Sequence, residues 1–169
     1  ENSNQEINMR IETRDSESGE IVAVEIADLS EDHLSRLTNE SVTDEQLDQL
    51  LDNMELSADA KALLSDVKAA TIKVGQQIVR VGKRIIEIVL AIVKQYPNVA
   101  FGAVLGMLVG LLISAIPILG ALLGALVVPI AIAFGLIHGY VEDLRDKAVD
   151  RKIREAVGMF EALNGQVTA

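Results

Sequence analysis

Cysteine is absent from the 169 residues, and the only aromatic side chains are three Phe and two Tyr. Without cysteine the chain has no disulfide, no Cys-ligated zinc site and no thiol nucleophile. So few aromatics argue against an aromatic-lined ligand pocket or a surface that stacks bases. The 15 basic and 25 acidic side chains give a net charge of −10, which repels phosphate backbones. Nucleic acid is therefore not an expected partner.

Motifs for catalysis or metal binding are also missing. The sequence has no glycine-rich phosphate loop with a lysine and no Ser–His pairing for nucleophilic catalysis. The turn from Asp15 to Gly19 is similar to a calcium loop, but its glycine comes one place early. His138, Glu142 and Asp146 share a helical face, where we expect an interfacial histidine beside solvated acids rather than a metal site. The sequence predicts neither an enzyme nor a bound cofactor or metal.

Charge is strongly segregated along the chain. Residues 1–60 carry 17 acidic and three basic side chains, a net charge of −14, and residues 61–95 carry seven basic and two acidic ones, a net charge of +5. Residues 95–141 contain no Asp, Glu, Lys or Arg, and the remaining residues are mixed. The pattern predicts an acidic head over 1–57, a basic helix over 58–96, a hydrophobic hairpin over 97–140 and an amphipathic C-terminal helix over 141–169.

The acidic head carries signals for short elements. Alternating apolar residues over 7–11 and 22–26 flank a turn, which is typical of a β-hairpin. One short helix is expected over 31–39, and a capping box at Thr43 opens a second over 44–53. Because a lone two-stranded hairpin is marginal in water, we expect the head to pack on a partner or on a neighbouring subunit.

A long helix is predicted from the Ser57 cap to Tyr96, which precedes Pro97. Within it, apolar side chains recur at alternating spacings of three and four, as in a heptad seam. The seam consists of Leu64, Val67, Thr71, Val74, Ile78, Val81, Ile85, Ile88 and Ile92. The basic residues are either the solvated face of a bundle helix or contacts for anionic lipid headgroups. The headgroup candidates are Lys73, Arg80, Lys83, Arg84 and Lys94.

The uncharged segment contains two hydrophobic runs, of 18 and 23 residues, divided at Pro117. As helices they would reach about 27 and 34 Å, against a hydrocarbon core of about 30 Å. This predicts a transmembrane hairpin with its tip at Pro117, a kink at Pro129 and interface anchors at Tyr96 and Tyr140. Its basic flanks place both termini on the cytoplasmic side. The alternative, a hairpin buried in a helical bundle, needs more amphipathic protein than a monomer of this length offers.

Small residues recur at four-residue spacing on both arms of this hairpin. Such stripes let helices approach closely in lipid. They serve either the contact between the two arms or the assembly of several copies. A stripe that is not used between the arms would be free for assembly, and we expect a homo-oligomer. The packing candidates are Gly102, Gly106, Gly110, Ser114, Gly120, Gly124, Gly135 and Gly139.

Together these patterns predict an all-α membrane protein with a long amphipathic helix, a glycine-rich transmembrane hairpin, an amphipathic C-terminal helix and a small acidic region of β-hairpin and short helices. Two functions stay open. In one, the hairpin inserts into anionic lipid and forms a pore or translocation assembly. A hydrophobic hairpin followed by an amphipathic helix resembles in kind the hydrophobic hairpin of pore-forming colicins. In the other, the hairpin only anchors a scaffold subunit whose acidic head binds a protein partner.

Overall fold

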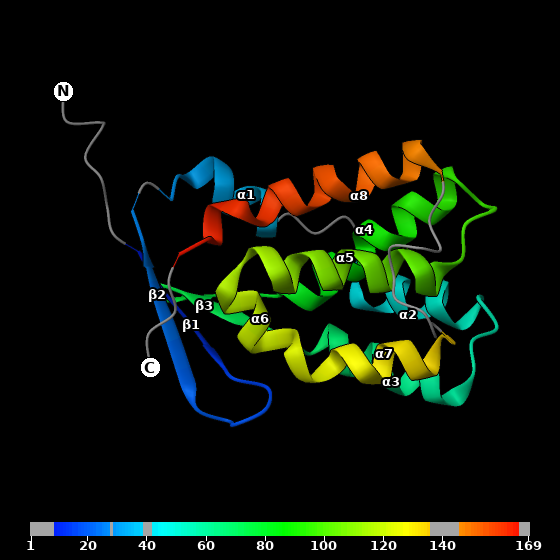
Figure 1. Ribbon diagram of the computed structural model, residues 1–169, viewed down its shortest axis with the longest axis horizontal. Coiled ribbons are helices and arrows are strands. Elements are labelled where there is room, and N and C mark those ends of the chain that lie inside the picture. Colours follow the sequence, from blue (N-terminus) through cyan, green and yellow to red (C-terminus); the bar gives the residue numbers. More distant parts are fainter. Residues whose placement is uncertain (1–8, 28, 39–41, 136–145, 166–169) are drawn as a thin grey trace.

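A four-stranded sheet and a group of helices make up the computed structural model, which describes residues 9–27, 29–38, 42–135 and 146–165 (Figure 1). The strands are β1 (Met9–Arg14), β2 (Ile21–Ile26), β3 (Ile72–Val74) and β4 (Gln77–Val79). The α-helices are α1 (Glu31–Thr38), α2 (Asp44–Asp52), α3 (Ala58–Lys68), α4 (Val81–Gln95), α5 (Phe101–Ala115), α6 (Pro117–Leu123), α7 (Val127–Ala133) and α8 (Lys147–Phe160). Short 3₁₀ turns are η2 (Gly124–Leu126) and η4 (Glu161–Leu163).

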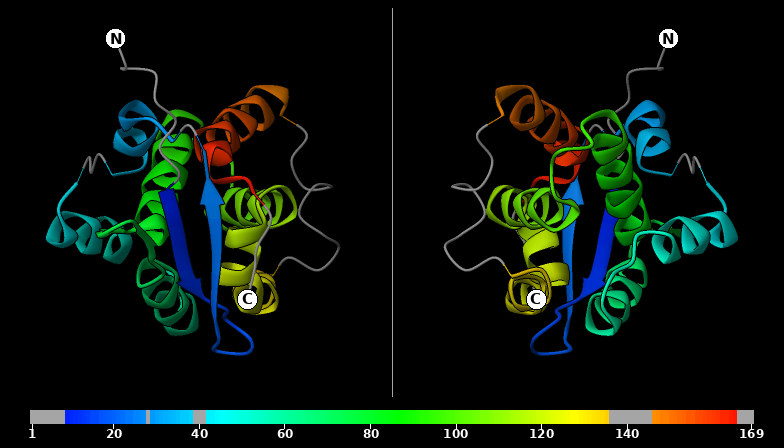
Figure 2. Two further views of the ribbon diagram at one scale, coloured as in Figure 1. Left: turned by 90° about the vertical axis from the view of Figure 1, so that its left-hand side faces the viewer. Right: turned by 90° about the vertical axis from the view of Figure 1, so that its right-hand side faces the viewer.

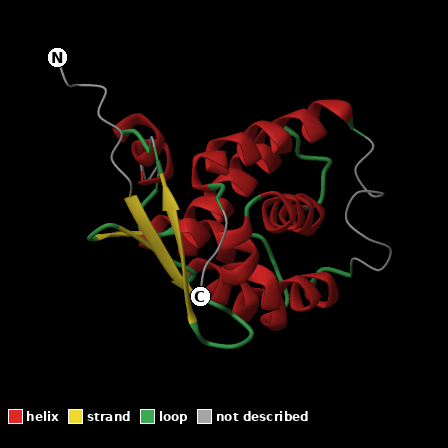
Figure 3. Ribbon diagram, turned by 60° about the vertical axis from the view of Figure 1, so that its left-hand side comes forward, coloured by secondary structure: helices red, strands yellow, loops and turns green. Residues whose placement is uncertain are grey.

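The sheet has the order β2-β1-β3-β4, and every neighbouring pair is antiparallel. The strands lie along one side of the helices (Figures 2 and 3). β1 and β2 pair where the alternation predicts a hairpin, and β3 adds to the free edge of β1. The buried side chains of Ile11, Val24 and Val74 form one layer across these three strands. The predicted all-α fold is therefore wrong, because the head hairpin is completed by strands from another part of the chain.

Those additional strands interrupt the helix that was predicted over 58–96. α3 does begin at Ser57, whose hydroxyl accepts a hydrogen bond from the helix N-terminus. The chain then leaves the helix and turns through β3 and β4, with Gly75 at a φ of 60°. Glycine adopts this conformation at little cost, as a two-residue hairpin turn requires, and the β-branched Ile72 and Val74 suit strands. One long amphipathic helix is thus replaced by α3, a β-hairpin and α4.

The uncharged segment is also broken into shorter pieces. α5 has 15 residues, and α6, η2 and α7 have 7, 3 and 7. The breaks fall before Pro117 and at η2, whereas Pro129 lies in the first turn of α7, where a missing N–H is tolerated. Among the described residues, no helix combines the length and the apolar character needed to span a bilayer. This finding overturns the predicted transmembrane hairpin, the pore-forming interpretation and the membrane localisation with cytoplasmic termini.

α5 is instead the central helix of the fold. It packs against α4, α6, α7 and α8, and Phe101 through Val109 are all buried (Figure 1). α8 supplies an apolar face at helical spacing, which includes Val149, Ile153 and Phe160. The chain's own amphipathic helices therefore cover the most hydrophobic segment.

Candidate protein-binding surface

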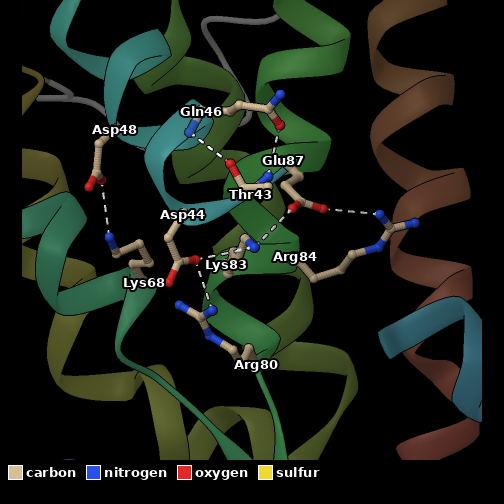
Figure 4. A network of polar contacts seen from close by, with 9 residues as sticks. All are labelled: Thr43, Asp44, Gln46, Asp48, Lys68, Arg80, Lys83, Arg84 and Glu87. Atoms are coloured by element: carbon tan, nitrogen blue, oxygen red, sulfur yellow. Dashed lines mark hydrogen bonds and ion pairs between the residues drawn. The ribbon is translucent and has the colours of Figure 1, made fainter. Parts of the chain in front are cut away.

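A network of ion pairs joins the start of α2 to the first turns of α4 (Figure 4). The Thr43 hydroxyl accepts a hydrogen bond from the Gln46 N–H, and the Gln46 side chain accepts one from the Thr43 N–H, so the predicted capping box is present. Arg80 donates to the Asp44 carboxylate at 2.8 Å, and Lys83 Nζ lies 3.2 Å from the same oxygen. The Arg80 and Lys83 hydrogen bonds lower the pKa of Asp44. Asp44 therefore stays ionised and fixes α2 on α4.

Lys83 is the buried centre of this network. Its side chain is only 1% exposed, and its ammonium lies 3.9 Å from the Glu87 carboxylate. Arg84 approaches the other oxygen of Glu87 at 3.3 Å. A buried charge is tolerated only when it is paired, and the two carboxylates meet this requirement for Lys83. The network is a structural connection between the acidic head and the helical core.

The basic residues predicted for lipid headgroups are thus distributed over different environments. Arg80, Lys83 and Arg84 pair with carboxylates of the protein itself. Lys73 lies on the outer face of the sheet opposite Glu12 and Ile78, and Lys94 is exposed near the end of α4. The predicted lipid role of these residues stays a prediction.

Two of the predicted small packing residues lie in close contacts within the chain. A Cβ at Gly102 would meet the Phe134 side chain, and one at Gly120 would lie 3.2 Å from the Ile113 carbonyl oxygen. Gly106 is buried, Gly110 is partly buried, and the exposed Ser114 donates to the Gly110 carbonyl.

The remaining predicted packing, tip and anchor positions lie in other parts of the fold. Gly124 starts η2, Gly135 is exposed at a φ of 69°, and Pro117 opens α6. Tyr96 is the C-cap of α4, while Gly139 and Tyr140 lie outside the described residues. Oligomerisation through any of these glycines stays a prediction.

A groove between α3 and α7 combines apolar and acidic side chains. We call it the α3–α7 groove, because α3 and α7 lie side by side and form its walls (Figure 1). It has a volume of about 460 Å³. Its lining consists of Ser57, Asp59, Ala62, Leu63, Asp66, Pro129, Ile132 and Ala133.

The α7 wall of the α3–α7 groove presents an apolar side chain that is unusually exposed. Ile132 of the lining is 76% exposed, and Val128, which lies one turn earlier on α7 and outside the lining, is 64% exposed. Both belong to the uncharged segment, so this side of the groove carries no charge. Scattered exposed apolar residues are ordinary, but neighbours one helical turn apart form a patch that is typical of interaction sites.

The rim of the α3–α7 groove is acidic. Asp59 and Asp66 are exposed, and neither forms an ion pair within the described parts of the chain. Their seven-residue spacing on α3 could have been noticed in the sequence. Their position beside residues 129–133 could not, because it depends on how α3 packs on α7.

The described residues give no support to the metal-binding patterns considered in the sequence. Within those ranges no group of three or more His, Asp or Glu side chains is placed to hold a metal ion. The Asp15 carboxylate accepts hydrogen bonds from the N–H groups of Ser18 and Glu17, which lower the pKa of Asp15 and close the turn between β1 and β2. His138 and Glu142 lie outside the described residues.

Comparison with known proteins adds no assignment: no family model, curated protein or solved structure matches the chain. The interpretation of its surfaces therefore rests on their geometry and charge.

Proposed function

We propose that the protein is a non-enzymatic scaffold or adaptor that binds a basic amphipathic helix of a partner protein in the α3–α7 groove. One observation carries the proposal: the exposed Ile132 on the α7 wall of the groove faces the side of α3 with two carboxylates that have no ion-pair partner in the described residues. A helix that lays its apolar face into such a groove is a recurrent mode of protein recognition.

The spacing of the acids specifies the partner further. Asp59 and Asp66 are separated by two helical turns, about 10 Å along α3. A partner helix with leucines along one face and lysines or arginines two turns apart beside them matches both features. The net charge of −10 also favours fast encounter with a basic partner.

The test uses a synthetic helix rather than an unidentified partner. A fluorescein-labelled peptide with leucines on one face and lysines beside them is titrated with the protein, and binding is followed by fluorescence anisotropy. A matched peptide carries glutamates in place of the lysines. We expect saturable binding of the basic peptide only, because the acidic peptide meets like charges at the rim.

Variants then locate the binding site. Ile132→Ser should weaken binding about fivefold or more, as for a central interface side chain, and Asp66→Asn about twofold, as for a rim charge. The controls are Ile78→Ser, which replaces an equally apolar side chain that is 58% exposed on β4, and Glu45→Gln, which removes an exposed acid on α2. Equal binding of the two peptides, or equal losses in Ile132→Ser and Ile78→Ser, would contradict the proposal.

A further inference from the structure

A second groove lies between the α2 region and α4, and we call it the α2–α4 groove. It shares no lining residue with the α3–α7 groove. It has a volume of about 380 Å³. Leu50 and Met54 form one wall, and Leu90 and Val93 of α4 form the other. Leu50 is 44% exposed, and the other three are partly buried. This combination of size and apolar lining is that of a small-molecule site.

The groove is open because contacts at both ends of α2 fix the position of this helix relative to α4. Its N-terminal end is fixed on α4 by the ion pairs of Asp44 with Arg80 and Lys83. Further along α2, Leu47 and Leu51 are buried in the core, which turns Leu50 away from it. The apolar walls therefore face each other across an open space.

Two of the described residues that line the α2–α4 groove are charged, and they differ in their surroundings. Glu87 is buried at one end and is paired with Lys83 and Arg84. Lys94 is exposed at the other end and forms no ion pair with any described residue. The two positions are seven residues apart, about 10 Å along the helix. The groove thus has one neutralised end, an apolar middle and one available ammonium group.

We infer that the α2–α4 groove binds a small amphipathic monoanion, a molecule with an apolar body and a single carboxylate or sulfonate at one end. The anionic group pairs with Lys94, and the apolar body lies between Leu50 and Leu90. The reverse orientation would place the anionic group beside Glu87, whose neighbouring cations Lys83 and Arg84 are already paired with that carboxylate. This inference does not depend on the proposed binding of a helix in the α3–α7 groove.

The experiment uses n-decanoate as the probe, below its micelle-forming concentration, with n-decyltrimethylammonium as the oppositely charged match. Methyl-selective NMR follows the protein during each titration. We expect decanoate to cause saturable shifts of the Leu50, Leu90 and Val93 methyl signals. Shifts that centre on Val128 and Ile132, or equal affinity for the cation, would overturn the inference.

Three variants complete the test. Ala91→Trp fills the groove from an exposed position on α4, so binding should be lost while the other methyl signals keep the pattern of a folded protein. Lys94→Gln should weaken decanoate binding about threefold, the effect of an exposed charge pair. Lys147→Gln is the control, because Lys147 is also exposed and forms no ion pair with a described residue. Equal affinities of Lys94→Gln and Lys147→Gln, or full binding by Ala91→Trp, would show that the groove is not the site.

Discussion

The two sides of α3 use their charges in different ways. On one side, Lys61 and Lys68 reach Asp52 and Asp48 of α2, at 3.8 and 3.0 Å. On the other side, Asp59 and Asp66 border the α3–α7 groove without an ion pair among the described residues. The two lysines of α3 thus form ion pairs with the acidic head, whereas the two aspartates on the opposite face of α3 remain available for a partner. The charge that matters for a partner is the charge left over after folding.

The largest expected effect concerns the buried contact between α3 and α4. The Gly82 N–H donates to the Ala70 carbonyl at 3.0 Å, and a Cβ at Gly82 would overlap the Val67 carbonyl. Because a backbone carbonyl cannot move aside easily, Gly82→Ala should lower the free energy of unfolding by about 3 kcal/mol. Urea denaturation measures the loss.

Gly158→Ala is the matched control for this substitution. Gly158 is exposed on α8, and a Cβ there would meet nothing within 4 Å. Since alanine favours helix over glycine, this variant should gain about 0.5 to 1 kcal/mol. A comparable loss in both variants would mean that α3 and α4 do not pack as closely as described.

A smaller loss is expected for the buried cation of the polar network. Lys83→Met removes an ammonium that is 1% exposed and leaves Asp44 and Glu87 each with one remaining cation. We expect a loss of about 2 kcal/mol, less than for an isolated buried pair because Arg80 and Arg84 still compensate. Lys68→Met breaks a more exposed pair, with Lys68 22% and Asp48 58% exposed, and should lose less than about 1 kcal/mol. Equal losses in urea denaturation would contradict the distinction between buried and exposed pairs.

Acid should weaken the same network. The hydrogen bonds from Arg80 and Lys83 lower the pKa of Asp44 in the folded state. The stability that this carboxylate contributes is therefore complete above its unfolded pKa of about 3.9 and is lost as the pH falls through the lower, folded value. The stability difference between the wild type and Asp44→Asn should shrink as the pH falls from 7 to 3. A difference that stays constant or grows, in denaturation series at each pH, would argue against the Asp44 contacts.

Local signals predicted the starts of elements better than their lengths. The caps at Thr43 and Ser57 lie where the sequence places them, because a cap depends on neighbouring residues alone. The predicted long helix failed because the apolar spacing of α3 continues through Val74 and Ile78, whose alternation belongs to strands. Gly75 was the available signal for a turn.

The inference that the uncharged segment needs more protein to cover it than the chain offers was wrong. The bilayer interpretation assumed two long helices that are apolar on all sides. In the described part of this segment, α5 is enclosed by α4, α6, α7 and α8, whereas α7 leaves Val128 and Ile132 exposed. The α3–α7 groove follows from that arrangement. It joins residues 59–66 to residues 129–133, and no local pattern connects segments so far apart.

The smallest expected effects distinguish the two unpaired acids of α3 from each other. Asp59 lies in the first turn, where a carboxylate is favoured by the helix dipole, and Asp66 lies in the last turn, where it is disfavoured. Asp59→Asn should therefore lose about 0.5 kcal/mol and Asp66→Asn should gain a similar amount, which corresponds to changes of about 1 to 2 °C in Tm, of opposite sign. Differential scanning calorimetry at low ionic strength can resolve them. Both variants should still bind the basic peptide more weakly, so weaker binding by the more stable Asp66→Asn would separate a role in recognition from a role in folding. A drop in Tm for Asp66→Asn would mean that this carboxylate has a stabilising contact within the chain and is not available to a partner.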